Sequence, residues 1–400
     1  MLEKLVQALV FFRKVCLHIK NHGVRKTGQE ALLRLQRKST APNTPKSSDE
    51  ELREFLRAAE RLLVINAGFK FDDKINQRSI ALASEAAKSG ISVLFIAWEW
   101  WPGELLDEET RLVKDNIFQI APRHFSAALS AASDIGMSDK LFILTVPTRE
   151  MALKITEAQA RGFRVIYDIF DDWESFNCVG QAPWYKKEIE HHAILNANKV
   201  TVVSPGLKKL FEPLRSNIAI VPNGYSPRNS VEDHERVPTT IGYFGHLADG
   251  WFDWDLVFGL ARQMPQLNIE IIGGGHSQEW EVEAQKYPNV KLLGIKPYED
   301  LPLLTRSWSV GLIPFRKSRL SECVDPLKVY EYLELGLLSI STGMPHLGQY
   351  PNCFHVESLD QLTALIERHV QGSLSASTPH ELSAFLAQAQ WSQRLKAVLA

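Results

Sequence analysis

Short apolar runs alternate with amphipathic segments along most of the chain. In the first half, runs rich in Val, Ile and Leu at 62–67, 92–97, 141–145, 164–170 and 199–203 indicate strands, and segments at 76–89, 149–161 and 184–196 have helical spacing. Strands that alternate with helices are typical of parallel β-α-β units. The pattern therefore predicts an α/β domain with a doubly wound parallel sheet over 49–225.

The same rhythm restarts in the second half, after a turn sequence at 222–224 and a polar stretch that ends near Pro238. Strands are expected at 240–244, 269–272, 290–293, 310–313 and 338–341, and helices at 254–263, 298–306 and 327–335. They predict a second Rossmann-like domain over 236–372, with a helix at 380–400 that returns to brace the first domain. Open α/β sheets bind ligands beyond the carboxyl ends of their strands, so two facing domains would enclose a binding cleft.

The first 48 residues are expected to form a basic extension and linker. Apolar side chains recur at helical spacing over 2–19, and 1–38 contains nine Lys and Arg residues and two Glu residues, a balance of +7. The Ser-, Thr- and Pro-rich stretch 39–48 indicates a linker, and the capping order Ser48-Asp49-Glu50-Glu51 predicts a helix from 48 to about 60. Two interpretations of 1–38 are open: attachment to an anionic membrane surface, or packing against the protein itself.

Composition narrows the function classes. A chain of 400 residues with 45% apolar content has room for two domains. Its net charge of −2 does not suggest a nucleic-acid partner. The four cysteines, Cys16, Cys178, Cys323 and Cys353, form no C-x-x-C pair, so neither a zinc site nor a disulfide framework is expected. No apolar run reaches the roughly 18 residues that span a bilayer, and no signal-peptide pattern is present, so a cytoplasmic setting is expected.

Glycines stand at two predicted strand ends in the second half. Gly245 and His246 follow one strand, and Gly273, Gly274 and Gly275 close the next. A glycine at such a turn lets backbone N–H groups approach a phosphate, and a helix N-terminus behind it adds partial positive charge. A tight turn chosen for packing explains Gly245 equally well, and a flexible loop explains the second run. No G-x-G-x-x-G is present to support a dinucleotide fingerprint.

The segment DPLKVYEYLELG at 325–336 is the most informative part of the chain. Asp325 is expected to cap a helix whose first residue is Pro326, so the free N–H groups of the helix start would face the cleft and bind a diphosphate. Lys328 adds a full charge one turn in. Glu331 lies one turn further along the same face and can accept hydrogen bonds from two ribose hydroxyls. The alternative is a surface helix with an ordinary i,i+3 ion pair.

This segment, with the strand LSIST after it, resembles the nucleotide-sugar-binding helix and strand of GT-B glycosyltransferases of family 4. Further stretches resemble the same family in order, among them IGYFGHLADGWFDWDLV, IEIIGGG, VKLLGIKPYEDLPLL and VGLIPF, and the resemblance spans about 62–370. It implies two Rossmann-like domains around a central cleft, with Glu331 on the ribose and the helix start on the diphosphate. The donor-binding residues that it implies are Gly245, His246, Gly274, Gly275, Ile295, Lys296, Tyr298, Pro326, Leu327, Lys328 and Glu331.

The sequence departs from the family pattern at two places. Many members carry a second Glu eight positions before the ribose-binding one, where this chain has Cys323. Many also place an Arg and a Lys after the glycine turn, where this chain has His246 and the run WFDW. These departures leave the sugar and the stereochemical outcome undetermined.

Carboxylates at one strand end of the first domain are candidates for the acceptor side. Asp168, Asp171 and Asp172 could accept the proton of an acceptor hydroxyl or orient the acceptor. The alternatives are a cation site and solvated loop charges. GT-B enzymes generally use the helix dipole and basic residues in place of a metal, so the resemblance implies none. The loop 68–73 with Asn76-Gln77-Arg78 resembles the acceptor-side loop of the family.

The resemblance implies transfer of a sugar from a nucleoside diphosphate sugar to a hydroxyl, by a hexosyltransferase that needs no metal and no cofactor besides this co-substrate. The basic extension favours a lipid-linked or polysaccharide acceptor, in cell-surface polysaccharide or glycolipid biosynthesis. Peripheral contact with the inner membrane surface is expected through 1–38. Two alternatives are open: a nucleotide-sugar epimerase of the same fold, and a non-catalytic nucleotide-sugar-binding subunit, which the departures at Cys323 and His246 motivate.

Overall fold

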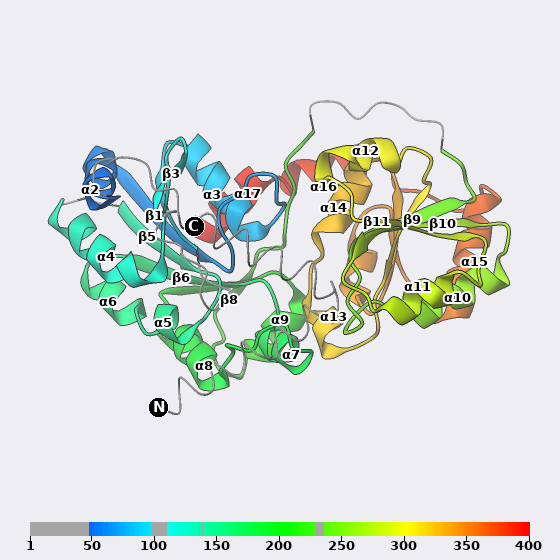
Figure 1. Ribbon diagram of the computed structural model, residues 1–400, viewed down its shortest axis with the longest axis horizontal. Helices are drawn as coiled ribbons and strands as arrows, with labels where there is room; N and C mark the ends of the chain where they lie inside the picture. Colours follow the sequence, from blue (N-terminus) through cyan, green and yellow to red (C-terminus); the bar gives the residue numbers. More distant parts are fainter. Residues whose placement is uncertain (1–47, 98–109, 136, 138, 229–235) are drawn as a thin grey trace, which may run out of the picture.

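The computed structural model describes residues 48–97, 110–135, 137, 139–228 and 236–400. These residues form two lobes, each built around a sheet of mostly parallel strands (Figure 1). The basic extension expected at 1–38 lies outside the described residues. Within the described ranges, no helix is long and apolar enough to cross a membrane.

The N-terminal domain contains an eight-stranded sheet with the order β3-β4-β2-β1-β5-β6-β7-β8, in which all neighbours are parallel except β3 and β4. Its strands are β1 Arg61–Ala67, β2 Ser92–Ala97, β3 Arg111–Lys114, β4 Ile117–Ile120, β5 Asp139–Leu144, β6 Arg164–Ile169, β7 Lys199–Val202 and β8 Ile218–Ile220. Its helices are α2 Ser48–Ala58, α3 Arg78–Lys88, α4 Phe125–Asp134, α5 Arg149–Ala152, α6 Ile155–Ala160, α7 Trp173–Cys178, α8 Lys187–Asn196 and α9 Pro205–Phe211. The helix expected from residue 48 is α2.

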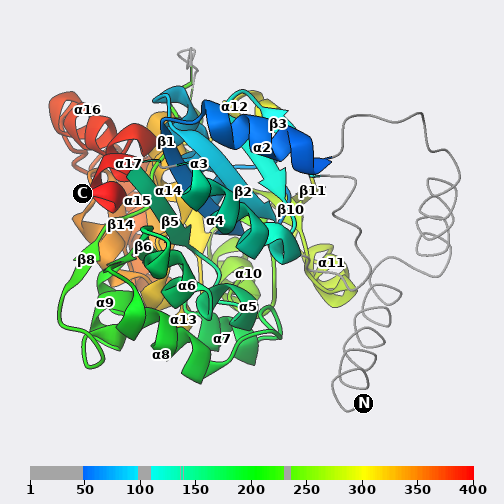
Figure 2. The same ribbon diagram turned by 90° about the vertical axis from the view of Figure 1, so that its left-hand side faces the viewer.

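Both faces of this sheet are covered, which explains the continuous apolar runs of its strands. Successive side chains of a strand point to opposite faces. In β1, Leu62 and Val64 pack in the core with α2, α4 and α8, whereas Leu63 and Ile65 pack in the core on the opposite face. That second core also contains α3 and the last helix of the chain, α17 Trp391–Leu399 (Figure 2).

The C-terminal domain contains a six-stranded, all-parallel sheet with the order β11-β10-β9-β12-β13-β14. Its strands are β9 Thr240–His246, β10 Asn268–Gly274, β11 Val290–Gly294, β12 Val310–Pro314, β13 Leu338–Thr342 and β14 Cys353–His355. Its helices are α10 Trp254–Gln263, α11 Gln278–Ala284, α12 Leu301–Leu304, α13 Arg319–Cys323, α14 Leu327–Glu334 and α15 Leu359–Val370.

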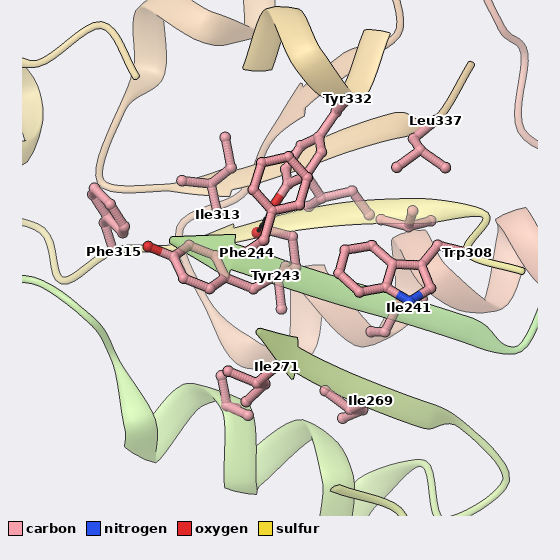
Figure 3. Close-up of a cluster of buried hydrophobic side chains, with 14 of the residues drawn as sticks. Ile241, Tyr243, Phe244, Ile269, Ile271, Trp308, Ile313, Phe315, Tyr332 and Leu337 are labelled. Atoms are coloured by element: carbon pink, nitrogen blue, oxygen red, sulfur yellow. Dashed lines mark hydrogen bonds between the residues drawn. The ribbon is translucent and has the colours of Figure 1, made fainter. Parts of the chain in front are cut away.

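Aromatic rings of the C-terminal core lie directly on strand glycines. A Cβ atom on Gly242 would lie 2.3 Å from the ring of Trp308, and one on Gly311 would lie 2.3 Å from the ring of Tyr332. Tyr332 also reaches strand β9, where its hydroxyl accepts a hydrogen bond from the backbone N–H of Phe244 at 3.3 Å (Figure 3). These contacts fix α14 against β9 and β12, the strands whose carboxyl ends face the cleft.

The C-terminal segment is two helices rather than the one expected at 380–400. Helix α16 Pro379–Gln388 packs on the C-terminal domain, where Phe385 stacks on Tyr330 with ring centres 6.0 Å apart. Helix α17 packs in the N-terminal domain through Trp391. The chain bends between them because Tyr225 exchanges backbone hydrogen bonds with Ala389 and Trp391, both at 3.1 Å. Only the second of the two helices therefore braces the first domain.

Candidate active site in the interdomain cleft

A cavity of about 240 Å³ lies between the two domains. It is lined by residues that follow the carboxyl ends of strands in both sheets. Asp171 and Phe176 follow β6, His246 and Trp251 follow β9, and Lys328 lies on α14. This is the position at which open parallel sheets bind ligands, and here two such positions meet.

The start of α14 faces this cavity without a side-chain cap. Pro326 is the N-cap residue, Leu327 is the first helical residue, and the proline side chain makes no cap hydrogen bond to this helix start. Pro326, Leu327 and Lys328 all line the cavity. Uncapped N–H groups at the positive end of a helix bind anions. The helix start therefore has the properties that a diphosphate requires.

The prediction that Asp325 caps this helix is wrong. Its carboxylate is fully buried and accepts hydrogen bonds from the Asn223 backbone N–H at 2.6 Å, the Tyr330 hydroxyl at 2.8 Å and the Tyr350 hydroxyl at 3.1 Å. Burial raises the pKa of Asp325 to about 6, although these hydrogen bonds act in the opposite direction. Three donors inside the protein thus outcompete the N–H groups of the helix, and Asp325 connects α14 to the N-terminal domain instead.

Lys328 is partly buried between two aromatic rings. Its ammonium group lies 5.2 Å from the ring centre of Tyr243 and 5.4 Å from that of Phe315. Such contacts favour the charged form, but removal of water opposes it. Burial prevails and lowers the pKa of Lys328 to about 8, against the charge of Glu331, which raises it. An anion bound in the cavity would stabilise the charged form of this ammonium group, because the charge of Glu331 does not offset the effect of burial.

The glycine turns at the ends of β9 and β10 pack against each other. A Cβ atom on Gly273 would lie 1.8 Å from the carbonyl oxygen of Gly245, and Gly273 has a φ of +148°. A Cβ atom on Gly275 would lie 2.4 Å from the His246 ring, and one on Gly274 would lie 3.0 Å from Ile295. Contact with backbone therefore requires glycine at 273, and a φ of +100° favours glycine at 275, whereas the exposed Ile295 side chain could move away from a Cβ atom at 274. At Gly245, a Cβ atom would lie 3.1 Å from the Cε atom of Lys328, so this glycine leaves room for the lysine.

His246 lies at the mouth of the cavity beside Trp251. Their ring centres are 5.4 Å apart, and the indole N–H of Trp251 donates to the His246 carbonyl oxygen at 3.4 Å. Burial lowers the pKa of His246, and the nearby charges of Lys328 and His276 lower it further. Trp251 also stacks on Phe176 of the N-terminal domain with ring centres 5.8 Å apart. The two domains thus share an aromatic wall.

Glu331 is buried, with 4% of its surface exposed. Its Oε1 atom accepts hydrogen bonds from Asn76 Nδ2 and from the Tyr298 hydroxyl, both at 2.6 Å. Of the remaining residues expected to bind the donor, Ile295 is 81% exposed and Lys296 is exposed as well. The structure therefore brings Tyr298 to Glu331, and it places Ile295 and Lys296 on the exposed surface, outside the lining of the cavity.

The three aspartates expected on the acceptor side have three different environments. Asp168 is fully buried and forms a two-pronged ion pair with Arg78, at 2.6 Å and 2.9 Å, and accepts from the Thr201 hydroxyl at 2.6 Å. Asp172 caps α7 through the Ser175 backbone N–H at 3.1 Å and forms an ion pair with Arg319 of the other domain at 2.7 Å. Both carboxylates are engaged by protein donors.

Asp171 is the aspartate of this set that lines the cavity. Burial raises the pKa of its carboxyl well above the usual 3.8, and the charge of the adjacent Asp172 adds to the effect. The cation-site alternative needs these side chains to converge, and among the described residues no group of three or more His, Cys, Asp or Glu side chains is arranged to hold a metal ion.

Three features of the site were not expected from the sequence: the ion pairs of Arg319, the contact of Asn76 with Glu331, and the aromatic wall. Arg319 also bonds to Glu174 at 3.0 Å. Each contact joins residues of different domains, so no local spacing could reveal it.

Cys323 stands at the position of the family's second Glu and is buried. Its carbonyl oxygen accepts a hydrogen bond from the Ser204 hydroxyl at 2.5 Å, and burial raises the pKa of its thiol to about 12.

Known structures share this architecture. No protein-family model and no curated protein matches the sequence. The crystal structure of HepE from Anabaena in complex with UDP is similar over 85% of this chain and 98% of that chain, with a TM-score of 0.58 and 13% identity. The fold is the GT-B fold. The expected fold class, two Rossmann-like domains that face a cleft, is thereby confirmed.

Two further structures support the same conclusion about the fold. The complex of HepE with UDP-glucose has a TM-score of 0.57 and 12% identity, and covers 85% of this chain and 98% of that chain. The α,α-trehalose 6-phosphate synthase from Burkholderia multivorans has a TM-score of 0.56 and 10% identity, and covers 85% of this chain and 95% of that chain.

Proposed function

We propose that this protein is a glycosyltransferase that transfers a sugar from a nucleoside diphosphate sugar to a hydroxyl group. The observation that carries the proposal is the uncapped start of α14, which faces a cleft cavity together with Lys328. Bond cleavage at the sugar leaves a nucleoside diphosphate with added negative charge. Helix N–H groups and an ammonium group that are already oriented stabilise this charge without reorganisation.

On the donor side, the diphosphate would lie against Leu327 and Lys328, and the ribose against Glu331. HepE forms complexes with UDP and with UDP-glucose, which makes uridine nucleotides the first candidates. The transferred group would be a hexose, and no cofactor beyond the donor is proposed. The oriented N–H groups and Lys328 support a mechanism that needs no metal, which predicts that EDTA leaves the activity unchanged.

On the acceptor side, we propose that Asp171 acts as the general base that accepts the proton of the attacking hydroxyl group. A carboxyl group with a raised pKa is a stronger base once it is ionised, and Asp171 lines the same cavity as Lys328. Asp168 and Asp172 would act through structure, because protein donors occupy both. The aromatic wall of Phe176 and Trp251 would exclude water that could hydrolyse the donor.

The acceptor that we propose is lipid-linked or a polysaccharide, in cell-surface polysaccharide or glycolipid biosynthesis. The reason is the basic, amphipathic pattern of 1–38, which favours peripheral attachment to the inner membrane surface from the cytoplasmic side.

A thermal-shift screen with UDP, GDP, ADP and TDP and their common sugar conjugates tests donor binding. A ligand at 100 times its Kd adds about 2.7 kcal/mol of stability. The donor that stabilises the protein is then incubated with and without candidate acceptors, and the products are analysed. Transfer supports the proposal. An isomerised donor without acceptor indicates an epimerase of the same fold, and binding without turnover indicates a non-catalytic subunit.

A further inference from the structure

The carboxylate that we assign to the ribose is covered by a side chain of the opposite domain. Asn76 belongs to the loop between β1 and α3, and its Nδ2 atom lies 2.6 Å from Oε1 of Glu331. Tyr298 donates to the same oxygen at 2.6 Å, and Asn76 lies 3.4 Å from the Tyr298 hydroxyl. With 4% of Glu331 exposed, a ribose cannot reach this carboxylate unless a neighbouring group moves.

Asn76 and a ribose would use the same bonding positions. A carboxylate only accepts hydrogen bonds, and both an amide N–H and a ribose hydroxyl donate to it. Tyr298 belongs to the same domain as Glu331, and burial together with the charge of Glu331 raises the pKa of Tyr298, so this phenol keeps its proton and donates. Asn76 comes from the other domain. It is the neighbour that can leave without disturbing the nucleotide-binding domain.

The chain around Asn76 is fixed on one side and exposed on the other. Two residues later, Arg78 is buried and forms its ion pair with Asp168 and hydrogen bonds to Pro222 and Asn223, both at 3.1 Å. Before it, residues 72–75 are exposed. Arg78 thus places Asn76 at the cleft, while the exposed part of the loop leaves the side chain free to withdraw.

We infer that Asn76 competes with the ribose of the donor for Glu331, so that the acceptor-side loop must withdraw from the nucleotide-binding domain before a nucleotide binds. The inference rests on the proposed function, because it takes Glu331 as the ribose ligand. The measured dissociation constant of a ligand is its intrinsic value divided by the fraction of protein that is competent to bind. The Asn76 contact lowers that fraction, and its removal should therefore tighten binding.

The test measures binding of UDP, uridine and inorganic pyrophosphate to the wild type and to Asn76→Ala by calorimetry. We expect Kd to fall by about tenfold for UDP and for uridine, which corresponds to about 1.4 kcal/mol. Pyrophosphate, which has no ribose, should bind both proteins equally. Asn76→Asp should also tighten nucleotide binding, since its carboxylate repels Glu331. Asp73→Asn changes an exposed residue of the same loop that pairs with Lys114 and should have no effect.

Weaker or unchanged UDP binding by Asn76→Ala would overturn the inference, because Asn76 would then hold the ribose or be irrelevant to it. Equal gains for UDP and pyrophosphate would overturn it as well, since they would indicate a general opening of the cleft. Binding of UDP, GDP, ADP or TDP to the variant alone would support it. If none of the four binds to either protein, the proposed function fails and the inference fails with it.

Discussion

Replacing Lys328 with Met should stabilise the free protein and weaken its hold on a diphosphate. Methionine has nearly the same length and can keep the contacts with Tyr243 and Phe315, but it carries no charge. The free protein no longer has to bury an ammonium group whose pKa is lowered to about 8. A residue that is placed for a ligand commonly costs stability when the ligand is absent.

The pKa gives the size and the pH dependence of this gain. A pKa decrease of one unit corresponds to about 1.4 kcal/mol. The decrease of the Lys328 pKa from 10.5 to about 8 therefore limits the gain in unfolding free energy to roughly 3 kcal/mol. Relaxation around this partly exposed side chain reduces the expected gain to about 1 to 3 kcal/mol. The folded wild type loses the proton near pH 8 and the unfolded chain near pH 10.5. The advantage of the variant is therefore complete below pH 8 and fades between pH 8 and 10.5.

The same variant should lose affinity for UDP but not for uridine. A hydrogen bond to a charged group contributes about 1.5 to 3 kcal/mol, which predicts a loss of roughly 10- to 150-fold for UDP. Binding of UDP to the wild type should also weaken above pH 8, because the free lysine then loses its proton.

Urea unfolding at pH 7 and pH 10 and calorimetric titration with both ligands measure these effects. Lys317→Met is the matched control, because Lys317 is 70% exposed and lies 3.8 Å from Glu357. A Lys328→Met variant that is less stable at pH 7, with equal losses for UDP and uridine, would show that Lys328 is a packing residue and refute the diphosphate assignment.

Three further predictions concern the rest of the site and the extension. Glu331→Gln should weaken UDP and uridine binding alike, and unchanged affinity in calorimetry would remove the ribose assignment. Asp171→Asn should keep donor binding and lose transfer in a product assay, so full turnover would contradict its role as base. Deleting 1–38 should release the protein from anionic vesicles at low salt. For the full-length chain, 1 M salt should have the same effect, because it limits charge interactions to about 3 Å. Full-length protein that stays in the supernatant at low salt would oppose membrane attachment.

The central strands could be predicted because burial on both faces makes their sequences continuously apolar. In β1, all residues after Arg61 are buried. Two edge strands, β3 and β14, escaped prediction for the opposite reason, whereas the edge strand β11 was expected at 290–293. Strand β3 has four residues with Arg111 and Lys114 at its ends, none of them buried, and β14 has three residues. Such short segments carry too few side chains to establish a period.

The break between α16 and α17 shows another limit. The amphipathic pattern of 380–400 continues without a glycine or proline, so nothing local marks an end. The helix stops at Ala389 because Tyr225, far away in the sequence, forms backbone hydrogen bonds on both sides of Gln390. An amphipathic pattern predicts which face of a helix becomes buried. It does not show that the first half of the segment packs on one domain and the second half on the other.

Within the site, the sequence predicts the helices and strands better than it predicts the hydrogen-bond partners of their side chains. The helix of Lys328 and Glu331 was predicted from a local run, and its start faces the cleft cavity. Its cap was mispredicted, because the preference of Asp for N-caps holds only when no stronger donors are near. Asp325 finds three donors, and the two tyrosines among them are not part of the cavity lining.

The aspartates after β6 show most clearly why residue type does not determine role. Their partners lie in different parts of the chain: Arg78 holds Asp168, and Arg319 holds Asp172. Each arginine forms an ion pair with its carboxylate, and the charge of Asp172 still raises the pKa of Asp171. A double exchange of Asp171 and Asp172 would therefore mix the loss of a base with the loss of an interdomain ion pair. Asp171 has to be changed alone, with Asp172 and its arginine intact, for lost transfer to report on the chemistry.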